Sequence, residues 1–182
     1  MFYGFSEDTI QFFVDIKFQN NSTFFQANKA RYEKVKLEFA QLISALQENM
    51  ELIDSNIDFR PSKALARIRR DTRFSKDKTP YRDHLWFLMR RSGEDREGAP
   101  FFWFELGIHE ATYGVGIWGE PKPFYDTLRQ ELRKNPKECG AILKSINQHG
   151  FQAYGERYKR IAIPSILPEE VMDIYKAKSY YI

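Results

Sequence analysis

The chain has 182 residues, 42% of them hydrophobic and 16% aromatic, which is enough to build the core of one ordinary domain. No apolar run approaches the roughly 18 residues that a membrane helix needs. The first thirteen residues carry Glu7 and Asp8 but no basic residue, so we expect no secretory signal there. The single Cys139 excludes an internal disulfide and a multi-cysteine metal site. We therefore expect a soluble, cytoplasmic protein without a membrane partner.

Charge is distributed unevenly along the sequence. The net charge is only +3, yet between Arg60 and Arg91 eleven basic residues accompany three acidic ones, a local charge of +8. The rest of the chain has 17 basic and 22 acidic residues, a charge of −5. Such asymmetry is informative about the charge of a partner rather than about the fold.

Two helices are predicted at the N-terminal end. Ser6 stands before two acidic residues, which is typical of a helix N-cap, and this helix is expected to end near Asn20. Thr23 and Gln26 have the spacing of a capping box. The apolar period after them predicts one long amphipathic helix that ends near Met50.

The middle of the chain has the patterns of a sheet. Residues 53–59 alternate apolar and polar, which predicts a half-buried strand, and residues 84–89 predict a strand covered on both faces. Residues 101–108 and 113–118 are the clearest strands. We expect them to form a hairpin with its turn at Glu110 and Ala111.

Three helices are predicted after the strands. One begins at Pro123 and carries Arg129, the next runs from Pro136 to Gly150, and the last begins at Pro168. Helices therefore come first, strands in the middle and helices last. This order predicts a single α+β domain over residues 1–182, with a central, mostly antiparallel sheet packed against N-terminal and C-terminal helices.

The first candidate site is the basic motif, residues 67–81. Two like charges about 7 Å apart repel by about 0.6 kcal/mol in water and about 2.4 kcal/mol at an effective dielectric of 20. The motif therefore requires compensating charge, either from protein carboxylates in an internal salt-bridge network or from a bound phosphate or carboxylate. Asp71 would orient the arginines or act as a base. The candidate ligand-binding residues are Arg67, Arg70, Asp71, Arg73, Lys76, Lys78 and Tyr81.

The second candidate site is one face of the predicted hairpin, where small and aromatic residues alternate. A glycine inside a strand costs about 0.5–1 kcal/mol relative to alanine, so several on one face indicate that something approaches the backbone closely. That neighbour is either a packed element of the fold or a ligand. In the expected register Trp103 lies opposite Trp118 and Glu105 opposite Gly116. The candidate pocket walls are Trp103, Glu105, Gly114, Gly116, Trp118 and Arg129.

Other chemistry is weakly indicated. Glu105 and His109 share a strand face and are compatible with an acid–base pair, although such residues are more often on the surface or satisfied in a core. The three histidines lack the spacing of a metal site, and Cys139 has no evident base beside it. We find no glycine-rich phosphate loop and predict no metal and no cofactor.

These motifs resemble the uncharacterised family known as domain of unknown function 2461, over nearly the whole chain. The resemblance rests mainly on residues 67–81, and further on Asn20-Asn21 with Phe25, Asn28 and Tyr32, on residues 114–118 with Leu128-Arg129, and on residues 159–178. It implies an intracellular protein and assigns no activity. Here Tyr113 and Val115 interrupt the glycine run of the family, and relatives often continue with more helix past Lys178, which implies a short variant or a truncation.

Three functions are compatible with the sequence. The first is a site for a small phosphorylated or carboxylate ligand, with or without catalysis. The second is a nucleic-acid-binding module, in which Tyr154, Tyr158 and Lys159 add stacking and charge to the basic segment. The third is a structural or interaction domain whose basic motif is an internal salt-bridge network. The sequence does not indicate an oligomeric state.

Overall fold

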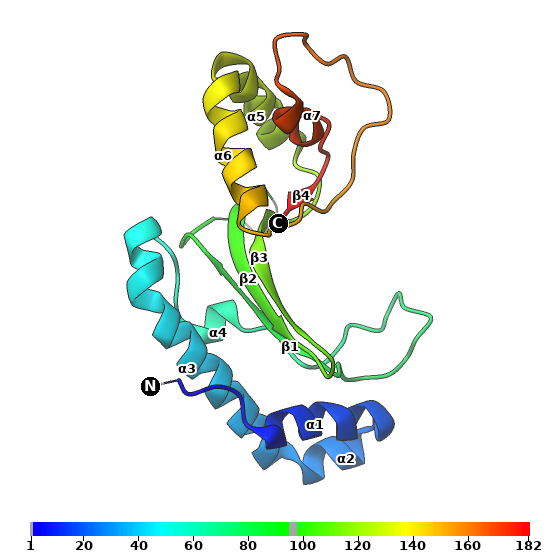
Figure 1. Ribbon diagram of the computed structural model, residues 1–182. Helices are drawn as coiled ribbons and strands as arrows, with labels where there is room; N and C mark the ends of the chain where they lie inside the picture. Colours follow the sequence, from blue (N-terminus) through cyan, green and yellow to red (C-terminus); the bar gives the residue numbers. More distant parts are fainter. Residues whose placement is uncertain (1, 95–97) are drawn as a thin grey trace. The chain divides into compact units, whose positions relative to one another are not determined.

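A computed structural model describes residues 2–94 and 98–182 (Figure 1). It confirms the α+β class, with helices at both ends of the chain and a four-stranded sheet of order β1-β2-β3-β4. The chain divides into two compact units. The first comprises residues up to Gly93 together with Phe102–Tyr113, and the second comprises Glu94–Phe101 and Gly114–Ile182.

The first helix, α1 (Glu7–Phe18), begins as predicted, because the Ser6 hydroxyl accepts a hydrogen bond from the backbone N–H of Thr9 at 3.3 Å. The single helix predicted after it is wrong. The structure has α2 (Ser22–Ala27) and α3 (Lys29–Ile53), which are separated at Asn28. Asn21, rather than Thr23, caps α2 by accepting from the N–H of Phe24 at 2.9 Å.

The strand predicted over residues 53–59 is also wrong. Helix α3 continues to Ile53, and Ile57 makes only an isolated antiparallel bridge to Arg91. The Asp54 side chain accepts from the backbone N–H of Asn56 at 3.0 Å, a local turn that competes with strand pairing. A short helix, α4 (Pro61–Ala64), follows.

The strands lie close to their predicted positions. This holds for β1 (Leu85–Arg90), β2 (Pro100–Leu106) and β3 (Ala111–Ile117), whereas the fourth strand, β4 (Tyr180–Tyr181), was not predicted. The predicted hairpin turn is wrong, because the N–H of Gly107 donates to the carbonyl of Glu110 at 3.0 Å. The turn thus centres on residues 108–109, and the pairing differs from the expected register by four residues. An even shift leaves each side chain on the face that alternation predicts.

The core of the first unit lies between β1, β2 and the helices α1 and α3. Alternate residues of β1 are buried, and the Phe87 ring stacks on Phe104 with 5.5 Å between centroids. This pattern means that only one face of β1 is fully buried, not both. The fully buried side chains of this core include Phe12, Phe13, Ile16, Val35, Phe39, Ile43, Leu85 and Phe87.

The second unit contains α5 (Lys122–Lys134), α6 (Pro136–Gln148) and α7 (Glu169–Tyr175). Its core consists of residues of these helices and of the segment 161–167, with Leu132 and Val171 at its centre. Each unit therefore has a hydrophobic core of its own. None of the described helices combines the length and the apolar composition required to cross a membrane.

Candidate anion-binding site

The first half of the basic motif is an extended segment that runs antiparallel to β1 and the residues before it. Isolated bridges join Leu65 to Phe87 and Arg69 to Tyr81. The Ile68 side chain enters the core, whereas the neighbouring Arg67 and Arg69 are exposed. The two arginines therefore stand on either side of a residue, Ile68, whose burial holds the segment against the core.

The end of the motif is fastened to the N-terminal helices. The Asn20 side chain donates to the carbonyl of Tyr81 and accepts from its N–H, both at 2.9 Å. The Tyr81 ring is buried and stacks on Phe25, with 4.3 Å between the ring centroids. Tyr81 is thus a structural anchor of the motif rather than a wall of an open site.

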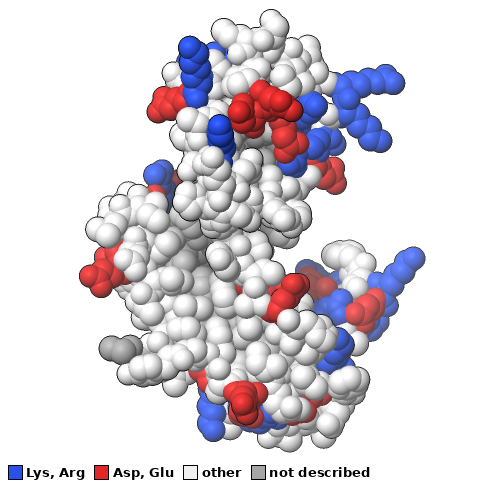
Figure 2. Space-filling view, viewed as in Figure 1, with Lys and Arg blue, Asp and Glu red and all other residues white. Residues whose placement is uncertain are grey.

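The loop between these anchors contains its own ion pairs. Arg73 donates to both oxygens of Asp71, the shortest contact being 2.7 Å, and Arg70 pairs with Asp77 and with the Thr79 hydroxyl. Hydrogen bonds from these arginines lower the pKa of Asp71 and of Asp77 to about 2. Figure 2 shows acidic and basic side chains interspersed over this loop. This part of the motif matches the predicted salt-bridge network.

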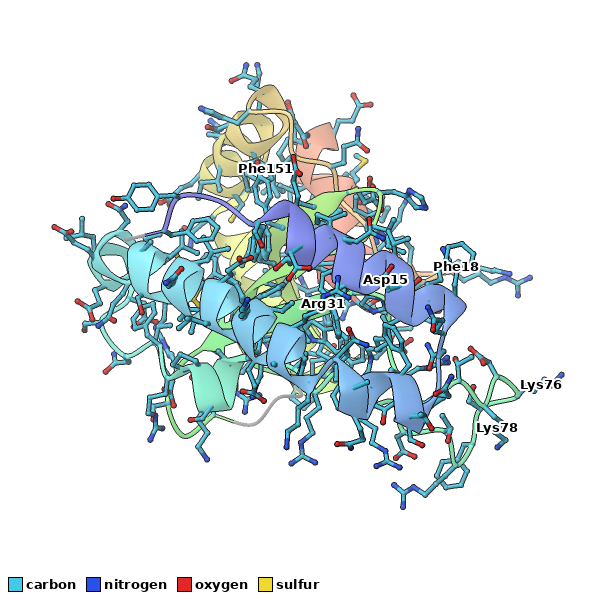
Figure 3. The ribbon with its side chains drawn as sticks, turned by 90° about the horizontal axis from the view of Figure 1, so that it is seen from below. Asp15, Phe18, Arg31, Lys76, Lys78 and Phe151 are labelled. Carbon is cyan, nitrogen blue, oxygen red and sulfur yellow. The ribbon has the colours of Figure 1, made fainter. Side chains whose placement is uncertain are left out.

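For the remaining cations of the motif, the described part of the chain supplies no carboxylate partner. Arg67, Arg69 and Lys76 make no ion pair with any described residue. Lys78 donates to the carbonyl of Thr72 at 2.9 Å, which is a neutral acceptor. Both lysines lie on the part of the loop that extends beyond the helices (Figure 3). The motif is therefore neutralised only in part by its own structure.

Arg67 and Arg69 lie at the edge of a shallow groove, which we name the Tyr32 groove. It has a volume of about 380 Å³ and is formed by α3, α4 and the segment after α4. Apolar and aromatic side chains account for most of its lining, and the three cations come from two different elements. The lining residues are Tyr32, Lys36, Pro61, Ser62, Leu65, Ala66, Arg67, Ile68 and Arg69.

The helix side of the Tyr32 groove is contributed by Tyr32 and Lys36, one turn apart on α3. Burial raises the pKa of Tyr32, and a backbone hydrogen bond from Ile68 counteracts part of that effect. The phenol is therefore neutral at physiological pH. The Lys36 ammonium lies 5.3 Å from the Tyr32 ring centroid and 2.6 Å from a Glu33 oxygen.

The candidate residues of the predicted hairpin are divided between the two units. Trp103 and Glu105 belong to the first unit, and Gly114, Gly116 and Trp118 belong to the second. Trp103 is half-buried, and Trp118 is exposed. A Cβ at Gly116 would overlap the Tyr181 side chain and lie 3.0 Å from its Cα. The close approach that the glycines predict is thus made at Gly116 by strand β4, an element of the fold.

Arg129 is buried in the second unit, at 6% exposure, and serves the fold. Its guanidinium donates to the carbonyls of Tyr175 at 2.9 Å and Ala177 at 2.6 Å, and it contacts Asp126 at 3.1 Å. These bonds join α5 to the segment that ends α7. A guanidinium with these partners is not available as the wall of a ligand pocket.

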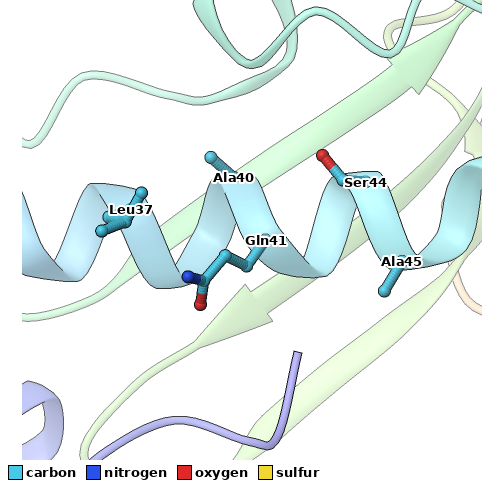
Figure 4. A pocket seen from close by; sticks show the side chains of 5 residues that line it. All are labelled: Leu37, Ala40, Gln41, Ser44 and Ala45. Carbon is cyan, nitrogen blue, oxygen red and sulfur yellow. The ribbon is translucent and has the colours of Figure 1, made fainter. Parts of the chain in front are cut away.

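Two further hollows lie in the first unit. One, of about 160 Å³, places Glu105 and His109 together with Asp83 and His84, whose Oδ1 and Nδ1 atoms are 3.0 Å apart. The described residues contain no group that could hold a metal ion. The other hollow lies along α3 and has no charged lining residue (Figure 4): Leu37, Ala40, Gln41, Ser44 and Ala45.

Sequence reasoning did not identify the α3 and α4 side of the Tyr32 groove. The pattern around Tyr32 and Lys36 is that of an ordinary amphipathic helix. The pattern at Pro61 and Ser62 indicates only that the predicted strand ends there. The turn at residues 54–56, which directs the chain back along α3, is what brings these residues beside Arg67. The only available signal was Tyr32, a bulky polar-tipped residue on the apolar face of the predicted helix.

Comparison with known sequences supports the resemblance noted above. Residues 8–182 match the family described as conserved hypothetical protein (DUF2461). Searches of curated proteins and of solved structures gave no match. Because the match covers nearly the whole chain, including the basic motif and all described helices except the first residue of α1, the protein belongs to the DUF2461 family.

Proposed function

We propose that the protein binds a small organic anion in the Tyr32 groove, with a phosphate or carboxylate group at Arg67 and Arg69. The observation that carries the proposal is that these two guanidiniums have no carboxylate partner among the described residues and border a groove with an apolar floor. Guanidinium groups donate in pairs to phosphate and carboxylate oxygens.

The floor favours a ligand with an apolar body. Tyr32, Leu65 and Ala66, which are all half-buried, offer carbon surface next to the two arginines, so contact with the ligand removes apolar area from water at about 25 cal/mol per Å². Each charge-assisted hydrogen bond contributes about 1.5–3 kcal/mol. The volume of about 380 Å³ lies within the range of small-molecule sites.

The role of Asp71 is that of an orienting group. A general base works best when its pKa is near the working pH, whereas the pKa of Asp71 is about 2. Its carboxylate holds Arg73 instead. The proposal is therefore one of binding, and it assigns no catalytic residue.

Titration calorimetry with phenyl phosphate and benzoate at low salt tests this function. We expect binding to the natural protein, and an affinity at least tenfold weaker for the double variant Arg67→Gln/Arg69→Gln, since each lost charge-assisted bond corresponds to tenfold or more. Arg73→Gln is the matched control, because Arg73 is bound by Asp71 and does not line the groove. Absence of heat with both ligands, or equal affinity of the double variant, would disprove the proposal.

A second candidate function, binding of single-stranded nucleic acid, is favoured by Phe74. This ring is 94% exposed at the end of the loop, with the Arg73 guanidinium 5.6 Å from its centroid, and Lys76 and Lys78 follow it. Exposed aromatic rings beside cations stack on bases. If four phosphates are contacted, the log–log salt dependence of affinity has a slope of about −3. Phe74→Ala should then weaken oligonucleotide binding in a fluorescence titration without weakening phenyl phosphate binding.

A further inference from the structure

Arg82 belongs to the basic run of the sequence, but its guanidinium binds the protein's own backbone. Its Nη1 donates to the carbonyl of Arg67 at 2.7 Å and to that of Arg69 at 2.9 Å. The backbone N–H of Arg82 donates to the carbonyl between them, that of Ile68, at 2.9 Å. One residue thus holds three consecutive carbonyl groups of the segment that carries the two groove arginines.

The backbone bond belongs to the antiparallel bridge between Arg69 and Tyr81, but regular strand pairing does not supply the two bonds from the Arg82 side chain. Between the bridges Leu65–Phe87 and Arg69–Tyr81 there are three residues on one side and five on the other, and the chain bends at Ile68. A bulge of this kind leaves carbonyl groups without ladder partners. The Arg82 side chain takes the place of those ladder donors at the carbonyls of Arg67 and Arg69.

The Arg82 guanidinium is itself held in place by an aromatic stack. Its Cζ lies 4.6 Å from the centroid of the Trp86 ring, and Trp86 stacks on His84 at 5.7 Å. The Nδ1 of His84 is in turn 3.0 Å from Asp83. A planar guanidinium can stack on an indole while the N–H groups in its own plane donate to carbonyls. A lysine ammonium is not planar and does not combine these two contacts in the same way.

We propose that Arg82 is a positioning residue for the anion site, which sets the bend at Ile68 and thereby holds Arg67 and Arg69 at the edge of the Tyr32 groove. This inference rests on the proposed function. It assigns Arg82 no contact with the ligand, so the basic segment contains cations of two kinds: those that would bind the ligand and one that shapes the backbone beneath them.

Arg82→Lys tests the proposal because it keeps the charge and removes the planar fork. We expect phenyl phosphate affinity to fall at least tenfold, as for loss of one ligand hydrogen bond, at a temperature where circular dichroism shows full folding. Amide hydrogen exchange over residues 66–70 should accelerate in the same variant. Arg60→Lys is the matched control, since Arg60 is exposed, pairs with Asp58 and does not line the groove.

The outcomes separate the two proposals. If the natural protein binds neither phenyl phosphate nor benzoate, the proposed function fails, and exchange over residues 66–70 still shows whether Arg82 holds the bend. If the natural protein binds and Arg82→Lys binds equally well, the positioning role is overturned. Should Arg82→Lys fail to fold, Trp86→Leu removes only the stacking surface. It is expected to weaken binding by a smaller factor, and unchanged affinity in that variant overturns the proposal.

Discussion

At the scale of single residues, the basic motif separates into paired and unpaired cations. Arg73 is held by Asp71, two residues before it, and Arg70 by Asp77, seven residues after it, whereas no described carboxylate pairs with Arg67 or Arg69 on the strand-like segment. The difference follows from position. Residues 71–79 form a polar loop that supplies both aspartates, and the segment before it borders apolar side chains.

The acid titration of the loop tests these pairs. The pKa of Asp71 is about 2, because hydrogen bonds from the Arg73 side chain and backbone favour the carboxylate, and the pKa of Asp77 is also about 2. A carboxyl group whose pKa lies below the ordinary 3.8 stabilises the folded loop above about pH 4, and this contribution is lost as the pH falls toward 2. Carboxyl carbon NMR shifts report both titrations.

Arg73→Gln provides the internal comparison. It should raise the pKa of Asp71 toward 3.8 and leave that of Asp77 near 2, because Asp77 is bound by Arg70. Equal values for Asp71 in the two proteins would show that this ion pair does not persist in solution.

Gly116 is a second residue at which the structure predicts a clear effect of substitution on stability. An alanine Cβ there would overlap Tyr181, to which Gly116 is paired in the β3–β4 ladder. We expect Gly116→Ala to lower the free energy of unfolding by about 1–3 kcal/mol, the usual range for overpacking. Gly107→Ala is the control, since its Cβ would meet the nearest atom, of His84, at 3.7 Å, an ordinary contact. Urea denaturation of both variants measures the difference, and equal loss in the two would contradict the interpretation.

At the scale of elements, the N-terminal helices and the basic motif form one fastened structure. Asn20, just after α1, satisfies both backbone groups of Tyr81 through the donor and the acceptor of one amide. The end of α1 therefore determines where the basic loop returns to β1.

Asn20→Asp should lower the free energy of unfolding by about 1–3 kcal/mol, because a carboxylate accepts from the Tyr81 N–H but cannot donate to its carbonyl. Gln19→Ala, one residue earlier and exposed, should change stability by less than about 0.5 kcal/mol. Thermal unfolding of the pair measures both effects. A smaller loss for Asn20→Asp than for Gln19→Ala would refute the fastening role.

Elements with long periods or clear caps were predictable from the sequence, and those decided by local side-chain bonds were not. Helix α1 follows from the cap at Ser6, β1 from a continuous apolar run, and β2 and β3 from two strand-like segments joined by a short link. The break at Asn28 and the end of the predicted strand at Asp54 depend on single side chains that bond to nearby backbone. For the candidate site, the unpaired arginines were predictable as a cationic segment, but the groove beside them arises from contacts between residues about 35 positions apart.

At the scale of the whole molecule, the chain has two hydrophobic cores that share no residue. Val35 in the first core and Val171 in the second have exposed fractions of 1% and 0%. Substitution of these two valines therefore tests the stability of each core in the same way. Their partners are α1, α3 and β1 in one case and α5, α6 and α7 in the other.

Val35→Ala and Val171→Ala should each cost about 1–3 kcal/mol, from the lost transfer free energy and the resulting cavity. If the units open separately, hydrogen exchange accelerates mainly in α1, α3 and β1 for the first variant and in α5 to α7 for the second. Uniform acceleration along the whole chain in both variants would instead indicate one cooperative unit.

The exposed ring of Phe74 has a practical consequence. A protease that cleaves after aromatic residues meets a solvent-exposed ring in the loop between Arg70 and Tyr81, whereas Phe18, which is also exposed, is the last residue of helix α1. A nick at this bond would divide the motif between two fragments that remain joined through the Arg82 contacts and the Asn20 amide. Limited digestion would thus yield a two-chain form of the protein.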